Sequence, residues 1–147
     1  PEGIPLGKTV LVECGPDSLW HVLALNIIAT CLKSQVGADY HAFSNHSDDI
    51  WCGLSRLGVK VEEAESTGLL LIIDYNSPGI GVPSNEKWSV KTLKLTDISI
   101  DRRQRIQEER PCLHLDENWL VVFEHNDEKS VVLFLKTKVI VATRSIQ

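Results

Sequence analysis

The stretch from Lys8 to Ser34 constrains the fold of this chain more than any other. It holds an apolar run over residues 9–14, a Gly-Pro pair at 15 and 16, and a long segment with helical periodicity. Apolar residues cover most of that segment's circumference, so we expect a helix buried on nearly all sides. They are Leu19, Trp20, Val22, Leu23, Ala24, Leu25, Ile27, Ile28, Cys31 and Leu32. Nucleotide-binding α/β proteins place their phosphate loop in such a strand-turn-helix.

Strands and helices alternate along the rest of the chain. The uninterrupted apolar run at residues 68–75 predicts a strand covered on both faces, as in a parallel sheet. The remaining segments predict strands at 36–43, 88–95, 111–116 and 139–143, helices at 47–58, 96–109 and 127–136, and loops at 58–68 and 76–87. Residues 119–124 are apolar and fit either type of element. The alternation predicts an α/β fold with three layers, in which helices flank a mainly parallel sheet.

The helix after residue 46 has recognisable ends. Ser47 followed by Asp48 and Asp49 predicts its start, with Ser47 as the capping side chain and the acids at the positive end of the helix dipole. Gly58 is placed to end the helix in the left-handed conformation. Both signals favour a short helix.

Composition limits the class of protein. With 147 residues, 43% of them hydrophobic, residues 1–147 can form a single domain with a core of its own. A net charge of -5 argues against nucleic acid as the main partner, because phosphate binding needs clustered Lys and Arg. No run reaches the roughly 18 apolar residues of a transmembrane helix, and the amino terminus lacks a signal-peptide pattern. We expect a cytoplasmic protein with no membrane partner.

The cysteines and histidines show no metal-ligand spacing. The chain has four Cys and five His, with no CxxC, HxxxH or HExxH pattern. Reduced, buried thiols therefore fit better than a disulfide framework or a zinc site. Cys112 and His114 could form a metal site only with partners from elsewhere in the chain. The residues are Cys14, Cys31, Cys52 and Cys112, and His21, His41, His46, His114 and His125.

Residues 3–26, 38–75, 95–106 and 112–135 together resemble the RecA superfamily, and most closely its KaiC-like branch, which is abundant in archaea. The segments begin GIPLGKTVLVECGPD, ADYHAFSN, LTDISID and CLHLDENW, and the likeness covers nearly the whole chain. The resemblance implies a P-loop-NTPase-like fold in truncated form, since a full RecA-like core has further strands. In that family a phosphate loop follows the first strand, a pair of glutamates ends another, and a magnesium-linked aspartate ends a later one.

The same resemblance implies that the phosphate loop is degenerate. Its position is occupied by Gly15, Pro16, Asp17 and Ser18. A working loop needs glycines to wrap the phosphates and a lysine to reach them, and both are missing here. The carboxylate of Asp17 would also repel a polyphosphate. ATP is therefore not expected as a ligand, and we expect no cofactor.

The acidic positions of the family are changed as well. Its glutamate pair falls on Ser44 and Asn45, and neither is a useful general base near neutral pH. Asp116 matches the magnesium-linked aspartate, but without a phosphate loop it has nothing to hold the ion against. A leftover polar residue or a helix cap is therefore favoured over a metal contact at Asp116. We expect no catalytic residue and no metal site.

The leading expectation is thus a pseudo-ATPase, a non-catalytic module that regulates or assembles through contacts with a protein partner or with its own copies. Trp51, Trp88 and Trp119 are candidates for such contacts, although core positions are favoured for each. The alternative is a divergent ATP-binding protein, with Ser18, Asp116 and Lys8 or Lys33 near the ligand. A DNA-related accessory factor is opposed by the acidic charge balance.

Overall fold

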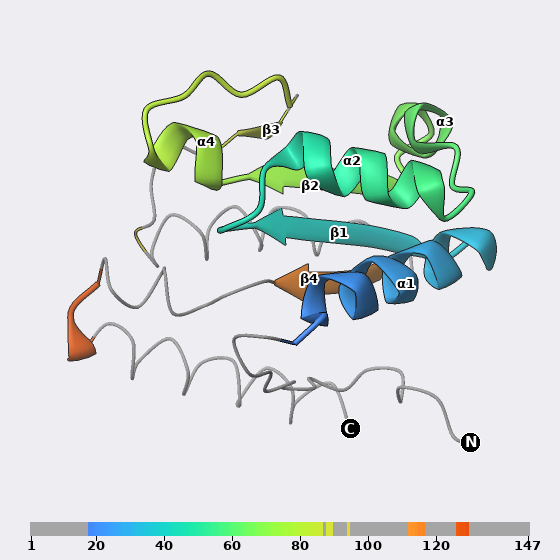
Figure 1. The fold of residues 1–147 in the computed structure, drawn as a ribbon, viewed down its shortest axis with the longest axis horizontal. Coiled ribbons are helices and arrows are strands. Elements are labelled where there is room, and N and C mark those ends of the chain that lie inside the picture. Colours follow the sequence, from blue (N-terminus) through green and yellow to red (C-terminus); the bar gives the residue numbers. More distant parts are fainter. Residues whose placement is uncertain (1–17, 87, 90–93, 95–111, 117–125, 130–147) are drawn as a thin grey trace.

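A computed structural model describes residues 18–86, 88–89, 94, 112–116 and 126–129 of the chain (Figure 1). Its helices are α1 (Trp20–Lys33), α2 (Ser47–Arg56), α3 (Val61–Ser66) and α4 (Asn76–Gly79), and its strands are β1 (Gly37–Ala42), β2 (Leu70–Asp74), β3 (Trp88–Ser89) and β4 (Cys112–Asp116). The strands form one sheet in the order β3-β2-β1-β4.

Every strand pair in this sheet is parallel. β1 lies between β2 and β4, with Ala38 opposite Leu70 on one side and opposite Leu113 on the other. Parallel neighbours need crossover connections, and α2 and α3 supply the one between β1 and β2. The α/β class and the parallel sheet are therefore confirmed, as are the predicted strands at β1, β2 and β4.

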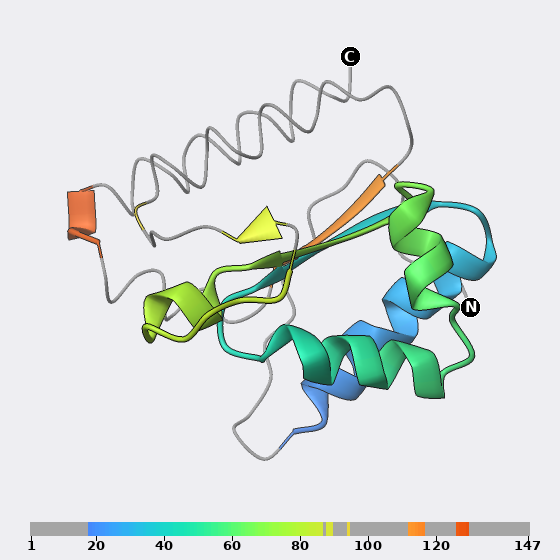
Figure 2. The ribbon, with the colours of Figure 1, turned by 90° about the horizontal axis from the view of Figure 1, so that it is seen from above.

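Helices α1, α2 and α3 cover one face of the sheet (Figure 2). The core between them is apolar and closely packed around Tyr40 of β1 and Leu54 of α2, which are both fully buried. Full burial of a side chain such as Leu contributes about 1.5–3 kcal/mol each. The buried cluster consists of Ala24, Ile28, Ala29, Leu32, Ala38, Tyr40, Ala42, Ile50, Leu54, Val61, Ala64, Leu70 and Ile72.

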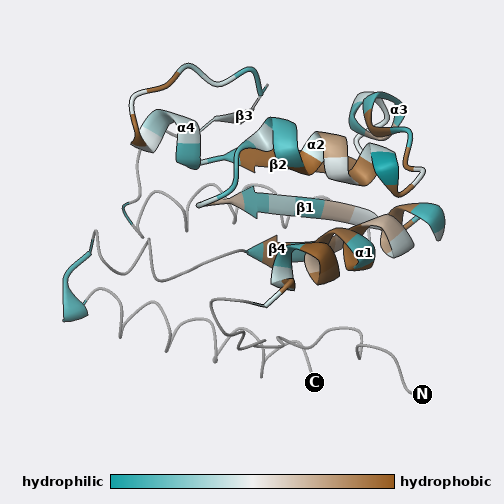
Figure 3. Cartoon of the chain, viewed as in Figure 1, coloured by the Kyte–Doolittle hydropathy of each residue, from teal (hydrophilic) through white to brown (hydrophobic). Residues whose placement is uncertain are grey.

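The first helix is present, but the expectation that it is buried on nearly all sides is wrong. Only Ala24, Ile28, Ala29 and Leu32 are buried, and they form a single stripe with the helical period. Leu23 is 48% exposed, although most residues of α1 are apolar (Figure 3). A helix on one face of a sheet buries only the stripe that meets the strands, and an all-round apolar sequence does not reveal which stripe that is.

The predicted loop at 58–68 contains helix α3, so that prediction is wrong. Val61 and Ala64, one turn apart, are buried in the core, and these two contacts are enough to hold a short helix against the sheet. The surrounding glutamates made the segment look like a polar loop. Gly58 has a φ of 80° at the end of α2, which confirms the predicted left-handed termination.

The cap of α2 also differs from the prediction. His46, not Ser47, precedes the first turn, and its Nδ1 accepts a hydrogen bond of 3.3 Å from the backbone N–H of Asp48. Ser47 is the first helical residue and is buried. An imidazole nitrogen placed two residues before an N–H can replace the usual hydroxyl or carboxylate, because only an acceptor is required.

Several predicted elements lie outside the described residues. They are the strand at 9–14, the helix at 96–109, the segment at 119–124 and the last strand at 139–143. Of the helix predicted at 127–136, residues 128 and 129 are helical. The predicted loop at 76–87 carries one helical turn, α4, in the part that is described.

Candidate functional site

The two faces of the sheet differ in chemistry. Successive side chains of a strand point to opposite faces, so Ala38 and Tyr40 of β1 face the helices while Asp39 and His41 face away from them. On β4 the leucines pack against the same core, which leaves its alternate residues on the other face. We call the part of this second face on β1 and β4, with Asp39, His41, Cys112, His114 and Asp116, the polar face; on β2 the same side of the sheet carries the apolar Leu71 and Ile73.

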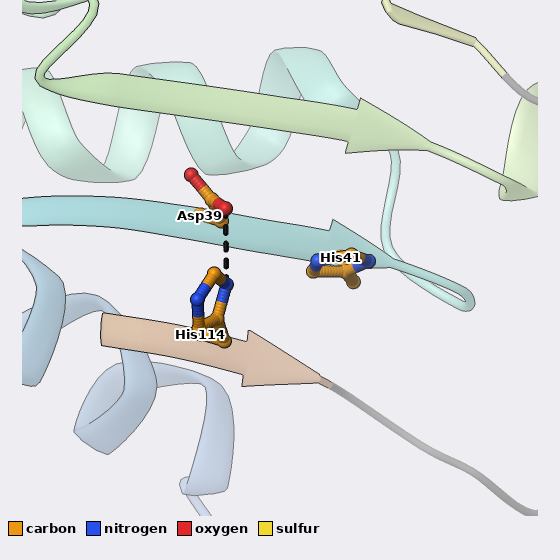
Figure 4. A group of neighbouring side chains, drawn as sticks. All are labelled: Asp39, His41 and His114. Atoms are coloured by element: carbon orange, nitrogen blue, oxygen red, sulfur yellow. Dashed lines mark ion pairs between the residues drawn. The ribbon is translucent and has the colours of Figure 1, made fainter. Parts of the chain in front are cut away.

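The register of β1 and β4 pairs acid with imidazole twice. Asp39 lies opposite His114, and His41 lies opposite Asp116. Asp39 Oδ2 is 3.0 Å from His114 Nδ1, an ion-pair and hydrogen-bond distance, and Figure 4 shows His114 of β4 directed at Asp39 of β1. Asp116 Oδ1 is 3.8 Å from His41 Nδ1. A D-x-H strand beside an H-x-D strand gives this crossed arrangement when the two are parallel.

Three of these side chains converge. Asp39, His41 and His114 each offer one potential ligand atom, and those atoms all lie within 4.8 Å of one another. The side chain of His41 is 0% exposed, whereas that of His114 is 31% exposed. The group therefore has a buried end on β1 and an end on β4 that reaches solvent. Among the described residues, this is the one cluster with metal-ligand chemistry.

Two aromatic rings that contact each other lie beside the ring of His41. Tyr75 stacks on it with ring centroids 5.8 Å apart, and Phe43 lies 6.4 Å away. Phe43 and Tyr75 also stack on each other at 4.6 Å. Because these rings are buried, they restrict the orientation of the imidazole.

The carboxyl group of Asp39 stays ionised despite its burial. Burial on its own raises the pKa of Asp39, but the hydrogen bond and charge of His114, the thiol of Cys112 and the charge of His41 together outweigh it. The net result is a pKa below the ordinary value. The polar face thus holds a fixed negative charge next to two imidazoles.

Of the predicted nucleotide-site residues, Gly15, Pro16 and Asp17 lie outside the described part of the chain. Ser18 is described two residues before α1 and is partly buried. Asp116 ends β4 as predicted, with its carboxylate beside His41. Ser44 and Asn45 follow the end of β1, in the turn before α2.

Lys33 is in the wrong place for the alternative nucleotide site. Its Nζ donates a hydrogen bond of 2.9 Å to the backbone oxygen of Leu57, at the end of α2. Ser18 and Lys33 flank opposite ends of α1, which separates them by about 20 Å at the helical rise of 1.5 Å per residue. The expectation that Lys33 lies near a ligand at Ser18 is therefore wrong. Lys8 lies outside the described residues.

Asp74, at the end of β2, is a structural residue that sequence reasoning missed. It is fully buried, and its two oxygens accept hydrogen bonds from the Ser77 N–H at 2.9 Å and from the Ser84 hydroxyl at 2.6 Å. Burial raises its pKa, but these bonds reverse the effect, so the pKa lies below the ordinary value. Asp residues are common in turns because their side chains accept hydrogen bonds from backbone N–H groups that follow closely in the chain, as Asp74 does from Ser77.

The exposure of the cysteines and tryptophans departs from the prediction in part. Cys31, Cys52 and Cys112 are reduced, as expected, but Cys52 is exposed and the other two are half-buried rather than buried. Burial raises the pKa of the Cys31 thiol. Trp51 is 40% exposed on α2, so the favoured core position is wrong for this residue. Trp119 and the side chain of Trp88 are not among the described parts.

Sequence reasoning missed Asp39 and His41 because no local spacing joins them to His114. The usable signal was the D-x-H and H-x-D pattern in two predicted strands, since residues two apart on a strand share a face. Knowing that β1 and β4 are neighbours was also required.

No helix in the described part of the chain is long and apolar enough to cross a membrane. No protein-family model matches this chain, and a search of curated proteins found no match.

Proposed function

We propose that the chain is a non-catalytic RecA/KaiC-like domain that works as a regulatory or assembly module through protein contacts. The observation that carries this proposal is the position of Asp116. A magnesium-linked aspartate must present its oxygens to the hydrated ion beside the nucleotide. The Asp116 side chain is instead 10% exposed and lies beside the buried imidazole of His41.

An apolar surface on α1 supports a role in protein contacts. Leu19, Val22 and Leu23 are all exposed and are spaced at i, i+3 and i+4, so they share one side of the helix. Exposed apolar side chains that gather on one side mark interaction surfaces more often than scattered ones do. The resemblance implies assembly of neighbouring domains, and we propose a second copy of this chain as the partner for this surface.

The absence of nucleotide binding can be tested by thermal unfolding with and without ATP and Mg²⁺. The proposal expects no change in Tm. A nucleotide present at 100 times its Kd would stabilise the fold by about 2.7 kcal/mol, which raises Tm by several degrees. A shift of this size with ATP, ADP or GTP would contradict the proposal and favour a divergent ATP-binding protein.

Assembly can be tested by sedimentation equilibrium of the wild type and of Leu23→Glu. The proposal expects wild-type oligomers that the charged variant weakens, because an ionised carboxylate cannot be buried in an apolar contact without a large cost. Ile80→Glu is the matched control, since Ile80 is also exposed but lies after α4. A wild-type chain that stays monomeric at every concentration would contradict self-assembly. Equal weakening by both variants would place the contact elsewhere.

A further inference from the structure

We propose that Asp39, His41 and His114 form a binding site for one divalent transition-metal ion of the zinc type. The site is independent of the proposed function, since it needs neither nucleotide nor assembly. It draws two ligands from β1 and one from β4, with Asp116 next to His41 as an additional acidic group.

The placement of the three ligands is fixed by the sheet. Asp39 and His41 are two residues apart on β1 and therefore share a face, and the parallel register sets His114 directly opposite Asp39. Stacking with Tyr75 and Phe43 restricts the ring of His41. Sites carried on strands hold their geometry better than sites on loops. The separation of 3.0 Å between Asp39 and His114 suits two ligands on adjacent positions of one ion.

The chemistry of the ligands selects the class of metal. Imidazole nitrogens favour zinc and other late first-row ions, whereas Mg²⁺ and Ca²⁺ prefer sites made of oxygen atoms. Two histidines and one carboxylate match a three-ligand zinc site with one position left for water.

A metal ion could reach the three ligands from solvent, and an acidic side chain lies next to one of them. His114 is partly exposed, so an ion can enter from the β4 side, while Asp39 and His41 are buried and can exclude competing water. Asp116 Oδ1 is 3.8 Å from His41 Nδ1. Carboxylates that are hydrogen-bonded to ligating imidazoles orient them, but this separation is an ion-pair distance and is too long for a hydrogen bond. Asp116 therefore adds negative charge beside the site rather than fixing the ring of His41.

A simpler account treats Asp39 and His114 as a hydrogen-bonded pair that stabilises the sheet. That account explains the distance of 3.0 Å but gives His41 no part in a shared site. The two accounts differ in one measurable respect, because only the metal site predicts stoichiometric ion binding that depends on all three side chains.

The experiment is a titration of the metal-free full chain with Co²⁺, followed by visible absorption, and with Zn²⁺ in competition. We expect one Co²⁺ per chain, with the ligand-field absorption of nitrogen and oxygen ligation, displaced by Zn²⁺ and unaffected by excess Mg²⁺. His114→Ala should lower the affinity by more than about 100-fold, since it removes a direct ligand rather than a neighbour. Asp116→Asn removes only a neighbouring charge and should lower the affinity less than His114→Ala does.

Matched controls separate this site from surface binding. His21→Ala removes an exposed histidine of α1, and Cys52→Ser removes an exposed thiol of α2. Both variants should bind Co²⁺ like the wild type. Because His114 is partly exposed, His114→Ala is expected to fold, and its circular dichroism spectrum checks this. Should it unfold, Asp39→Asn gives the same test with nearly unchanged shape.

Three results would overturn the proposal. The first is a folded wild type that binds no Co²⁺ or Zn²⁺. The second is unchanged affinity in His114→Ala or Asp39→Asn. The third is loss of binding in the control variants, which would identify an adventitious surface site. None of these results bears on nucleotide binding or assembly, so failure here leaves the proposed function to its own tests.

Discussion

Asp74 shows how one buried charge can organise the end of a strand. Its two oxygens accept hydrogen bonds from Ser77 and Ser84, which tie α4 and the following loop back to β2. Hydrogen bonds to an ionised group contribute about 1.5–3 kcal/mol each, more than neutral ones. The loop at 76–84 is therefore held at both ends by a single side chain.

Glu86 lies near the Asp74 carboxylate, but its pKa is shifted in the opposite direction. Burial raises its pKa, as do the charges of Glu65, Asp74 and Asp48, while Ser47 counteracts them in part. Since the pKa in the folded state exceeds the ordinary value, the ionised form destabilises the fold. This penalty is absent below the unfolded-state pKa, near 4.3 for Glu, and is complete once the pH exceeds the folded-state pKa.

We predict that Glu86→Gln raises the free energy of urea unfolding at pH 7. The gain should disappear at about pH 4 and below, where the wild-type carboxyl is protonated in both states. Glu62→Gln, on the exposed side of α3, serves as the control and should change little. A loss of stability in Glu86→Gln at pH 7 would mean that the ionised carboxylate is favourably paired.

The strands were predicted more accurately than the helices. An uninterrupted apolar run such as that of β2 predicts a strand buried inside a sheet. This prediction is confirmed, because β2 pairs with β1 on one side and with β3 on the other. Helix α3 was missed because two buried residues, Val61 and Ala64, hold it among exposed acids. Its stability comes from tertiary contact, which a local pattern does not contain.

The left-handed conformation of Gly58 at the end of α2 can be tested by substitution. Gly58 has a φ of 80° with open space around its Cα, so a side chain there would meet backbone strain but no clash. We predict that Gly58→Ala destabilises the fold by about 1–2 kcal/mol in urea unfolding. Gly79 also has open space but no positive φ, so Gly79→Ala should be neutral or stabilise by up to about 1 kcal/mol. Equal effects of both substitutions would contradict a conformational origin.

The sequence predicted the class of fold but not which residues share each face of the sheet. The alternation of elements was sufficient for a parallel α/β sheet. It was not sufficient to predict that β4 pairs with β1, and the polar face depends on that pairing. Strand order is set by packing among distant segments. Asp39, His41 and His114 could therefore not be assembled from spacing alone.

In the described part of the chain, the core between the helices and the sheet predicts different effects of substituting two leucines. Leu54 is fully buried in the centre of the cluster, whereas Leu23 of α1 is exposed. We predict that Leu54→Ala lowers the free energy of unfolding by about 2–5 kcal/mol, because it removes buried methyl groups and leaves a cavity. Leu23→Ala should change it by no more than about 0.5 kcal/mol. Urea unfolding at low protein concentration measures both. A large loss in Leu23→Ala would show that α1 is covered on this side as well.

The pairing of β1 with β4 has a kinetic consequence. Asp39 and His114 are about 75 residues apart along the chain, so their encounter requires the closure of a long loop, which is entropically costly and slow. A nascent or partly folded chain that lacks β4 cannot present the three ligands together. An ion captured between these strands would act as a clip across that loop, so its arrival would report the completion of folding.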